Sequence, residues 1–395
     1  MSTMKQWGSV IALGLRSIPA RPGESIVVIV GVAMVVAVFV SVFGMAAGFE
    51  KVMALAGHPN RAIVLGGSAD SEGGSDLSRE AAQLLSNTPG IRRTEKGEPM
   101  LSAEALAFVP LMDRASGLDA SVTLRGVGTA GLSMRPEVRL VEGRMFHPGS
   151  REVIVGRAVQ QRMVAAGVGN SVGLPDGDWQ ITGVFESGGD ARESEMLTDA
   201  ETLMTAFRRQ SFNSVLMTLE GANALQIAKD SITSNPRLTV NVQREDEYVA
   251  QSSSYVRGLL RAIAFGIGTI MALGAAFGAI NTMYSSVSTR STEIATLRAI
   301  GFQPAAVVAS VLIESMLLAL VGAVIGAGLA WLFFSGAAVS TLAGSSASQV
   351  TYSLELTTGV FASGILIACA IGFFGGLLPA VRAGTQPIVE AIRKG

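Results

Sequence analysis

Residues 25–47 read SIVVIVGVAMVVAVFVSVFGMAA, 23 consecutive positions without a charged side chain. A bilayer core of about 30 Å requires roughly 20 consecutive apolar residues in a helix, so this segment predicts a membrane span. A basic start followed by an apolar run also resembles a secretory signal. The run is nevertheless longer than the apolar core of about 7–15 residues that such signals have. We therefore expect an uncleaved helix.

Three further segments, residues 262–283, 305–334 and 359–378, are also apolar and meet the same length requirement. The second of them carries one acidic residue, Glu314. The whole chain of 395 residues is 49% hydrophobic and 15% charged, against about 25% charged residues in soluble domains. The sequence therefore predicts four transmembrane helices.

The residue types needed for common catalytic and metal centres are scarce. Cys369 is the single cysteine and His58 and His147 are the only histidines, which excludes a disulfide framework and leaves little for a zinc site or a Ser/His/Asp triad. No G-x-x-x-x-G-K-[ST] motif occurs, so no phosphate-binding loop is expected. We therefore expect no catalytic site, no bound metal and no cofactor held by this chain.

Basic residues flank the spans unevenly. They precede the first span, follow the fourth and occupy the connection between the second and third, whereas residues 335–358 contain no Lys or Arg. By the positive-inside rule both termini are cytoplasmic, in a multi-pass protein of the cell's inner membrane. The predicted order is a cytoplasmic amphipathic helix 1–24, span 25–47, extracytoplasmic domain 48–256, span 262–283, cytoplasmic coupling loop 284–304, span 305–334, short extracytoplasmic loop 335–358, span 359–378 and cytoplasmic tail 379–395.

The segment 48–256 holds 26 of the 31 acidic and 20 of the 30 basic side chains. Strand-like stretches at 62–65, 214–219 and 238–242 alternate with helical ones that begin after Ser78 and at residue 222, and further strands follow at 121–127, 152–155 and 180–185. Two βαβ-like halves around a strand-rich middle predict an extracytoplasmic α/β domain with a βαβ-rich core and an inserted strand-rich subdomain.

Between the second and third spans lies the segment STRSTEIATLRAIGF, residues 288–302. Apolar and charged side chains alternate there at helical spacing, and Gly301 with Pro304 suits a helix end. A short amphipathic helix of this kind is either a docking surface for a cytosolic partner or a connector whose charges only set topology. The candidate coupling residues are Arg290, Glu293, Ile294, Leu297, Arg298 and Ile300.

These residues resemble the R-x-x-E-I-G-x-L-R-A-[LI]-G signature of FtsX-like, MacB-type ABC permeases, with Thr289 and Ala295 as departures from the usual Glu and Gly. The C-terminal residues 379–383 and 387–393 resemble the family's P-A-x-R-A and P-x-E-A-[LI]-R runs. Residues 142–144 and 151–153, EGR and REV, resemble runs in its periplasmic core domain.

The resemblance implies a non-enzymatic permease that pairs with a second permease subunit, identical or different, and with a separate cytosolic ABC ATPase dimer that uses ATP and Mg. ATP hydrolysis would move the outer domains to export or extract a lipoprotein, peptide or small toxic molecule, with an adaptor, a lipoprotein carrier or a hydrolase as a further partner. An FtsX-like scaffold that activates a cell-wall hydrolase without transport is the alternative. Lipids are expected partners and nucleic acid is not.

Glu314 and two glycines carry the remaining predictions. A carboxylate inside a span is costly, so Glu314 must face protein or water. It lies either on a substrate or proton path or, as we expect, in a structural contact to Asn281 or Thr282. Gly322 and Gly326 form a small-xxx-small pattern that permits close helix packing.

The charge distribution predicts which sites an impermeant thiol reagent reaches. In a Cys369-free background, cysteine at Ser75 or Asp178 should react in intact cells, or in spheroplasts if an outer membrane intervenes. Cysteine at Ser291 should react only after lysis, and its labelling without lysis would reverse the orientation.

Overall fold

The computed structural model describes residues 22–221, 223–342 and 349–387, and it divides into two compact units. The membrane unit comprises the described parts of Met1–Ala47, Leu259–Ala337 and Leu354–Gly395. The α/β unit comprises Gly48–Gly258 and Ala338–Ser353. The amphipathic helix predicted for residues 1–24 falls, except for its last three positions, outside the described residues.

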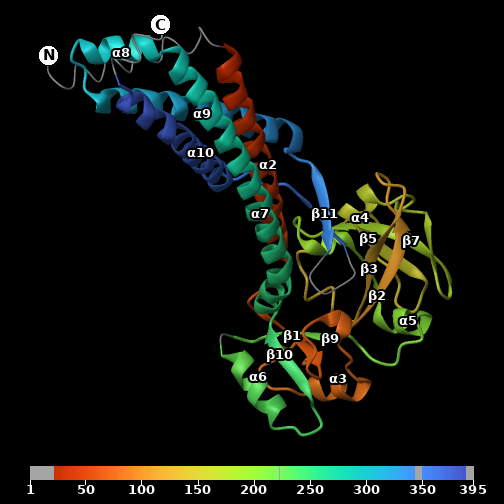
Figure 1. Ribbon diagram of the computed structural model, residues 1–395. Helices are drawn as coiled ribbons and strands as arrows, with labels where there is room; N and C mark the ends of the chain where they lie inside the picture. The colour runs from red at the N-terminus through yellow and green to blue at the C-terminus, as the bar shows by residue number, and fades with distance from the viewer. Residues whose placement is uncertain (1–21, 222, 343–348, 388–395) are drawn as a thin grey trace. The chain divides into compact units, whose positions relative to one another are not determined.

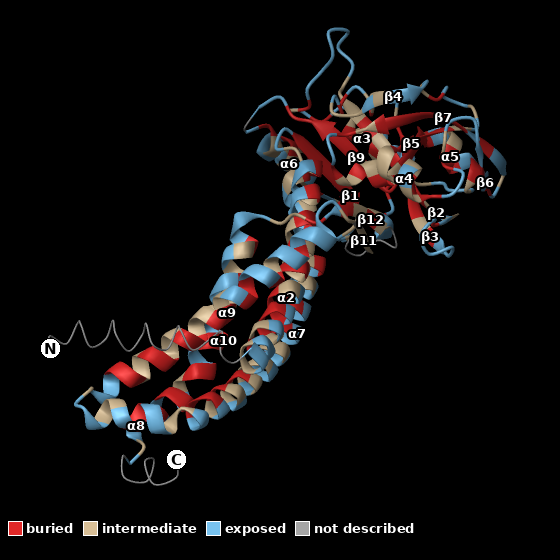
Figure 2. Cartoon of the chain, turned by 90° about the horizontal axis from the view of Figure 1, so that it is seen from above, coloured by how far each residue is buried: buried red, intermediate tan, exposed pale blue. Residues whose placement is uncertain are grey.

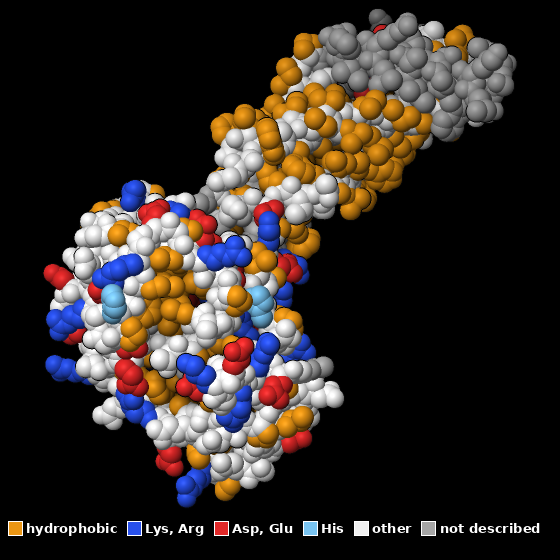
Figure 3. All heavy atoms as spheres, turned by 180° about the vertical axis from the view of Figure 1, so that it is seen from behind, with side chains coloured by type: hydrophobic (Ala, Val, Ile, Leu, Met, Phe, Trp, Pro, Cys, Tyr) orange, Lys and Arg blue, Asp and Glu red, His pale blue; other side chains and the backbone are white. Residues whose placement is uncertain are grey.

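Among the described residues, four helices are long and apolar enough to cross a membrane: α2 (Pro22–Ala56), α7 (Glu245–Thr289), α9 (Pro304–Phe334) and α10 (Thr358–Thr385). With 35 and 45 residues, α2 and α7 are about 52 and 68 Å long at roughly 1.5 Å per residue. Both exceed the bilayer core, and both continue into the α/β unit. Their buried faces alternate with exposed ones (Figure 2), and the exposed side chains of the membrane unit are mainly apolar (Figure 3).

Glycines bring the membrane helices into close contact. A Cβ at Gly322 would lie 2.8 Å from the Ile29 carbonyl oxygen, and one at Gly326 only 2.3 Å from that of Ala33. The pattern identified in the sequence therefore packs α9 against α2 within this chain. On the same face of α9 but nearer its start, a Cβ at Gly372 or Gly376 of α10 would clash with Ala319 or Ser315 in the same way. Larger residues at these positions would force the helices apart.

The α/β unit is built on one ten-stranded sheet in the order β10-β1-β9-β2-β3-β8-β5-β7-β4, with β6 paired to β7. The strands are β1 (Arg61–Gly66), β2 (Leu101–Met112), β3 (Asp119–Val127), β4 (Arg139–Gly143), β5 (Glu152–Gly156), β6 (Ser171–Leu174), β7 (Gly177–Glu186), β8 (Glu195–Asp199), β9 (Ser214–Thr218) and β10 (Val240–Arg244). The helices are α3 (Arg79–Leu85), α4 (Arg157–Arg162), α5 (Ala200–Ala206) and α6 (Ala224–Thr233), with short 3-10 turns η2 (Glu72–Gly74) and η3 (Ala191–Ser194).

The first and last parts of this unit form two interleaved βαβ motifs. Strand β1 pairs antiparallel with both β9 and β10, so β9, α6 and β10 enclose β1. Strand β9 pairs antiparallel with both β1 and β2, so β1, α3 and β2 enclose β9. Between β2 and β9 the chain inserts the strands β3–β8, joined to the first part by the long β2–β3 hairpin. The predicted fold class, four apolar helices and an α/β domain with an inserted strand-rich subdomain, is confirmed.

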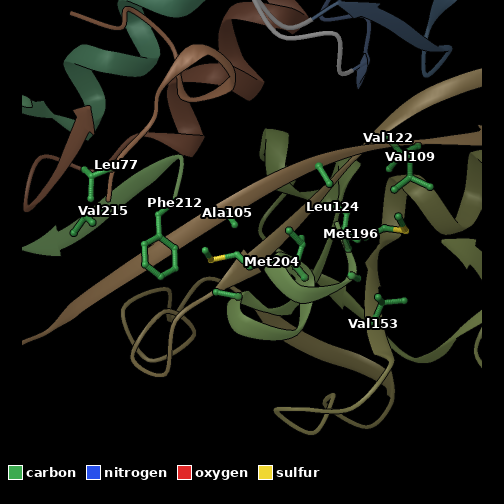
Figure 4. Close-up of a cluster of buried hydrophobic side chains, with 14 of the residues drawn as sticks. Leu77, Ala105, Val109, Val122, Leu124, Val153, Met196, Met204, Phe212 and Val215 are labelled. Atoms are coloured by element: carbon green, nitrogen blue, oxygen red, sulfur yellow. The ribbon is translucent and has the colours of Figure 1, made fainter. Parts of the chain in front are cut away.

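One continuous apolar core runs under both parts of the sheet. Figure 4 shows Phe212 and Leu77 at one end of the cluster, and Val109, Val122 and Val153 toward the other. Trp179 is fully buried in the same core, and its indole nitrogen donates a hydrogen bond to Asp176. Ser75 is also buried, at 6% exposure, whereas Asp178 is exposed and is the better position for thiol labelling.

The connection between α9 and α10, expected as a short loop over residues 335–358, contains a β-hairpin of β11 (Ala338–Leu342) and β12 (Gln349–Ser353). It belongs to the α/β unit. The Thr351 amide donates to Ser194 Oγ at 2.9 Å, Arg162 donates to Gln349 at 2.6 Å, and the Tyr352 ring lies 5.6 Å from that of Phe49. These tertiary contacts hold the hairpin, whose residues Val350, Thr351 and Tyr352 are of types enriched in strands.

Glu104 of β2 is the most deeply buried carboxylate of the sheet, with its side chain 1% exposed. It accepts hydrogen bonds from Arg135 at 2.6 and 2.9 Å and from Arg125 at 3.0 Å. Burial alone would raise the pKa of Glu104, but the charges of Arg135 and Arg125 outweigh it and lower the pKa to about 2. Ionised Glu104 therefore stabilises the folded unit.

The stability of the α/β unit should depend on this carboxylate in a pH-dependent way. Because its folded pKa lies below the ordinary value of 4.5, its contribution is present above that pH and is lost as the pH falls toward about 2. Glu104→Gln leaves two buried guanidinium groups under-compensated and should cost about 3 kcal/mol at neutral pH. Thermal unfolding of the purified chain between pH 7 and 3 should show a shallower acid loss for the variant.

Glu201→Gln is the matched control, because the Arg79–Glu201 pair is about half exposed and contributes little. If Glu104→Gln has the same neutral stability and acid profile as Glu201→Gln, the buried pair does not stabilise the fold.

Candidate coupling site

Helix α8 (Ser291–Ala299) lies between α7 and α9, where the sequence predicted an amphipathic helix. Arg290 separates it from α7 with φ −105° and ψ 12°. Gly301, at φ +98°, ends the turn in the left-handed region that favours glycine, and Pro304 stands at the start of α9. The local sequence therefore forces two sharp changes of direction around a nine-residue helix.

Arg290 ties this segment to α9. Its Nη1 donates to Glu314 Oε2 at 3.0 Å, and the two side chains are only 14% and 8% exposed. The same guanidinium lies 3.6 Å from Glu293, whose side chain is 72% exposed. Glu314 thus has an ion-pair partner in Arg290 that the sequence did not predict, and the Thr282 hydroxyl donates to the Gly278 carbonyl. A buried carboxylate is stabilised far better by a guanidinium than by an amide or hydroxyl.

Arg298 ties the other end of α8 to the segment that follows α10, because its Nη1 donates to the Gln386 carbonyl oxygen. The apolar residues divide between two environments. Ile294 is 7% exposed and belongs to the core of the membrane unit, Leu297 is half-buried, and Ile300 is 68% exposed. The apolar stripe expected to face a partner therefore keeps only Ile300 and part of Leu297 on the surface.

The first turn of α7 is held inside the α/β unit by several hydrogen bonds. Glu245, its first residue, accepts hydrogen bonds from Arg61 Nε at 2.6 Å, from the His58 amide at 3.1 Å and from Arg192. Arg192 also donates to the carbonyl oxygen of Ala56, the last residue of α2, at 2.8 Å. The ends of α2 and α7 thus meet at one guanidinium, and we call this group the joint.

Electrostatics favour the charged state of Arg192. Burial alone would lower the pKa of Arg192, but Glu245 and Asp190 outweigh it and raise the pKa above its usual value. Arg61 and Glu245 are 5% and 4% exposed, so little water competes for their hydrogen bonds. No sequence motif predicted these residues, although the acidic run 245–247 is typical of the start of a helix.

The described residues offer no group of three His, Cys, Asp or Glu side chains that could hold a metal ion. What the arrangement provides is mechanical: α8 is bound to α9 and to the end of α10, and a single helix leads from it to the joint.

Comparison with known proteins agrees with this architecture. The model of the MacB-like periplasmic core domain matches residues 25–235, and the model of the FtsX-like permease C-terminal region matches residues 265–388. The chain belongs to the FtsX-like, MacB-type permeases. The first match covers more than half of the chain, from the first span to the end of α6, and the second covers the other three spans and α8.

An ABC transporter permease of Bacillus subtilis, YknZ, is 23% identical to this FtsX-like permease over 97% of this chain and 98% of its own length. The macrolide export ATP-binding/permease proteins MacB of Nitrobacter winogradskyi and Rhodopseudomonas palustris are 25% and 24% identical, and the matches cover 39% and 55% of their lengths. Among solved structures, the periplasmic region of MacB from Actinobacillus actinomycetemcomitans covers 49% of this chain with 13% identity and a TM-score of 0.38.

The Arg290–Glu314 pair should be energetically coupled. Glu314→Leu or Arg290→Leu alone leaves one buried charge without its partner and should lower stability by about 3 kcal/mol, whereas the double variant should lose less than either single variant. The thermal unfolding midpoint of the permease in detergent measures this. Thr282→Val, at the partner first expected for Glu314, should have little effect.

A double variant as unstable as the sum of the two single variants would show that the pair contributes no coupling.

Proposed function

We propose that this permease is the membrane subunit of an ABC transport system and that it works with a separate cytosolic ATPase dimer. ATP and Mg²⁺ are used by that partner, and this chain converts the ATPase movement into movement of its extracytoplasmic domain. The cargo is an exported or extracted molecule such as a lipoprotein, a peptide or a small toxic compound. A second permease subunit completes the assembly.

The single observation that carries this proposal is the way α8 is connected. Its exposed side offers Glu293 and Ile300, while Arg290 and Arg298 bind it to the structure on either side. A partner that displaces α8 must therefore also displace α9 and the end of α10. A mere connector would not require a buried ion pair at this position, because the desolvation of two charges is costly.

The second support is the continuity of α7. It runs through 45 residues without a proline and ends at Glu245 in the joint. Proline is a main cause of sharp kinks in helices, and α7 is one helix along its whole length, so it can transmit displacement along its axis. The buried hydrogen bonds of Arg192 to Glu245 and Ala56 then pass the displacement to η3 and to the strands beside it.

The names of the MacB relatives describe macrolide export and combine ATP-binding and permease functions in one protein. Of the properties in these names, we propose only outward transport for this chain. An outward-acting transporter agrees with an extracytoplasmic domain that is tied to the membrane helices at several points. The nature of the cargo follows from the experiment rather than from the fold.

Docking of the ATPase should depend on the exposed end of α8. Ile300→Ala should weaken co-purification of the ABC ATPase about tenfold, since a buried apolar anchor at an interface contributes on the order of 1–2 kcal/mol. Glu293→Gln should weaken it less, because an exposed rim charge mainly affects encounter. The measurement is the ratio of ATPase to permease after purification from the native membrane, with the ATPase identified by mass spectrometry, together with ATP turnover of the complex.

Ile227→Ala provides the matched control, since Ile227 is an exposed isoleucine on α6 at 49% exposure. Ile294→Ala should act differently from Ile300→Ala, by destabilising the membrane unit in which Ile294 is buried. If Ile300→Ala and Leu297→Ala retain full ATPase binding and full turnover, α8 is only a connector and the proposal fails.

A further inference from the structure

A cavity of about 140 Å³ lies inside the α/β unit. Its walls come from the sheet, from η2 and η3, from the last turn of α2 and from the first turns of α7. Every residue that lines it belongs to the α/β unit, within Gly48–Gly258 and Ala338–Ser353. The cavity therefore adjoins the joint and is bounded by both helices that continue into the membrane unit.

One side of the cavity is apolar. Met53, Leu106, Phe108, Leu216 and Val249 line it. An engineered protein cavity of about 150 Å³ with a similar apolar lining binds benzene, so this volume accommodates a group the size of one aromatic ring. Unlike that cavity, however, this one has a second, highly charged side.

The charged side is organised around Arg125 of β3. Its guanidinium donates to Glu195 at 2.8 Å, to Glu72 at 2.9 Å and to Glu104 at 3.0 Å, and all three of its nitrogens take part. Three carboxylates thus share one cation, and only Glu104 has a second guanidinium, that of Arg135. The Arg125 side chain is 10% exposed, so this arrangement is largely removed from water.

The lining has an excess of negative charge. Four carboxylates line the cavity, those of Glu72, Glu104, Glu195 and Glu245, against the three guanidinium groups of Arg125, Arg135 and Arg192. The pKa of Glu72 is lowered, because Arg125 outweighs the effect of burial, so this carboxylate is ionised at neutral pH. Glu245 is also paired with Arg61 from outside the lining, so the excess falls on the other three carboxylates, which share only Arg125 and Arg135. A bound cation would offset this excess, because an excess of buried charge is unfavourable.

A separate observation concerns a hydrogen-bond donor. Arg135 lines the same cavity at 2% exposure, and its Nε is buried without a hydrogen-bond partner in the described part of the chain. Buried donors of this kind are normally satisfied, so the site suits a ligand that also carries an acceptor oxygen. The apolar side of the cavity favours an organic cation.

We infer that this cavity is a binding site for a small organic cation, namely an amine with an apolar body of about one ring and a hydroxyl group. The ammonium group would offset the excess carboxylate charge, the ring would occupy the apolar side, and the hydroxyl oxygen would accept a hydrogen bond. This inference concerns binding to the α/β unit alone. It stands or falls independently of ATPase coupling.

The test uses the full-length chain in detergent and isothermal titration with three compounds of nearly equal size. These are 2-amino-1-phenylethanol, the neutral 1-phenylethane-1,2-diol and the anion mandelate. The amine should bind, the diol should bind about tenfold more weakly because it lacks the charge-assisted hydrogen bond, and mandelate should not bind. No binding of the amine at millimolar concentration, or equal binding of amine and diol, overturns the inference.

Two variants locate the binding. Ser252→Leu places a larger side chain from α7 into the cavity without changing its charge and should abolish binding of the amine. Glu195→Gln removes one of the excess carboxylates and should weaken the amine about tenfold while leaving the diol unchanged. Glu201→Gln, at an exposed ion pair outside the cavity lining, should bind as the unaltered chain does.

Thermal unfolding checks that each variant is folded. If Glu195→Gln is unstable, amine binding to Ser252→Leu alone tests whether the amine occupies this cavity. Amine binding that survives in Ser252→Leu would place the compound elsewhere and reject the site.

Discussion

Hydrocarbon offers no hydrogen-bond partner to a peptide group, and this constraint shapes the whole chain. Within the bilayer a helix satisfies its own backbone, so the four apolar segments must be helical, and small residues let them pack closely. Glycines at 322, 326, 372 and 376 then set how closely the helices pack. The strands and buried ion pairs of the protein are concentrated in the α/β unit, where backbone and carboxylates have other partners.

Buried ion pairs lie at two places where helices begin or end. The ion pair Arg290–Glu314 lies where α8 meets α9, and the pairs of Glu245 with Arg61 and Arg192 lie where α7 begins. Each fixes a helix end to its surroundings through a contact that is largely withdrawn from water. Such contacts stabilise less than an equal volume of apolar packing, but they allow only one geometry. Connections that transmit movement require this specificity of position.

The sequence predicted what depends on local pattern. Apolar length identified the spans, Ser78 identified the start of α3, and Gly301 identified the end of α8. It could not predict contacts between distant residues. The joint brings Arg61, Arg192 and Glu245 together from three parts of the chain, and no local sequence pattern predicts this contact. The burial of Ile294 and the choice of Arg290 as partner of Glu314 were missed for the same reason, because both depend on how helices pack.

The hairpin β11–β12 changes how many covalent links join the two units. The chain passes between them at residues 47–48, 258–259, 337–338 and 353–354, which makes four links where a simple loop between α9 and α10 would leave two. With the hairpin in the α/β unit, α9 and α10 are joined to that unit by the chain itself, as α2 and α7 are. All four apolar helices therefore have a direct covalent connection to the α/β unit, which a loop that stayed within the membrane unit would limit to two.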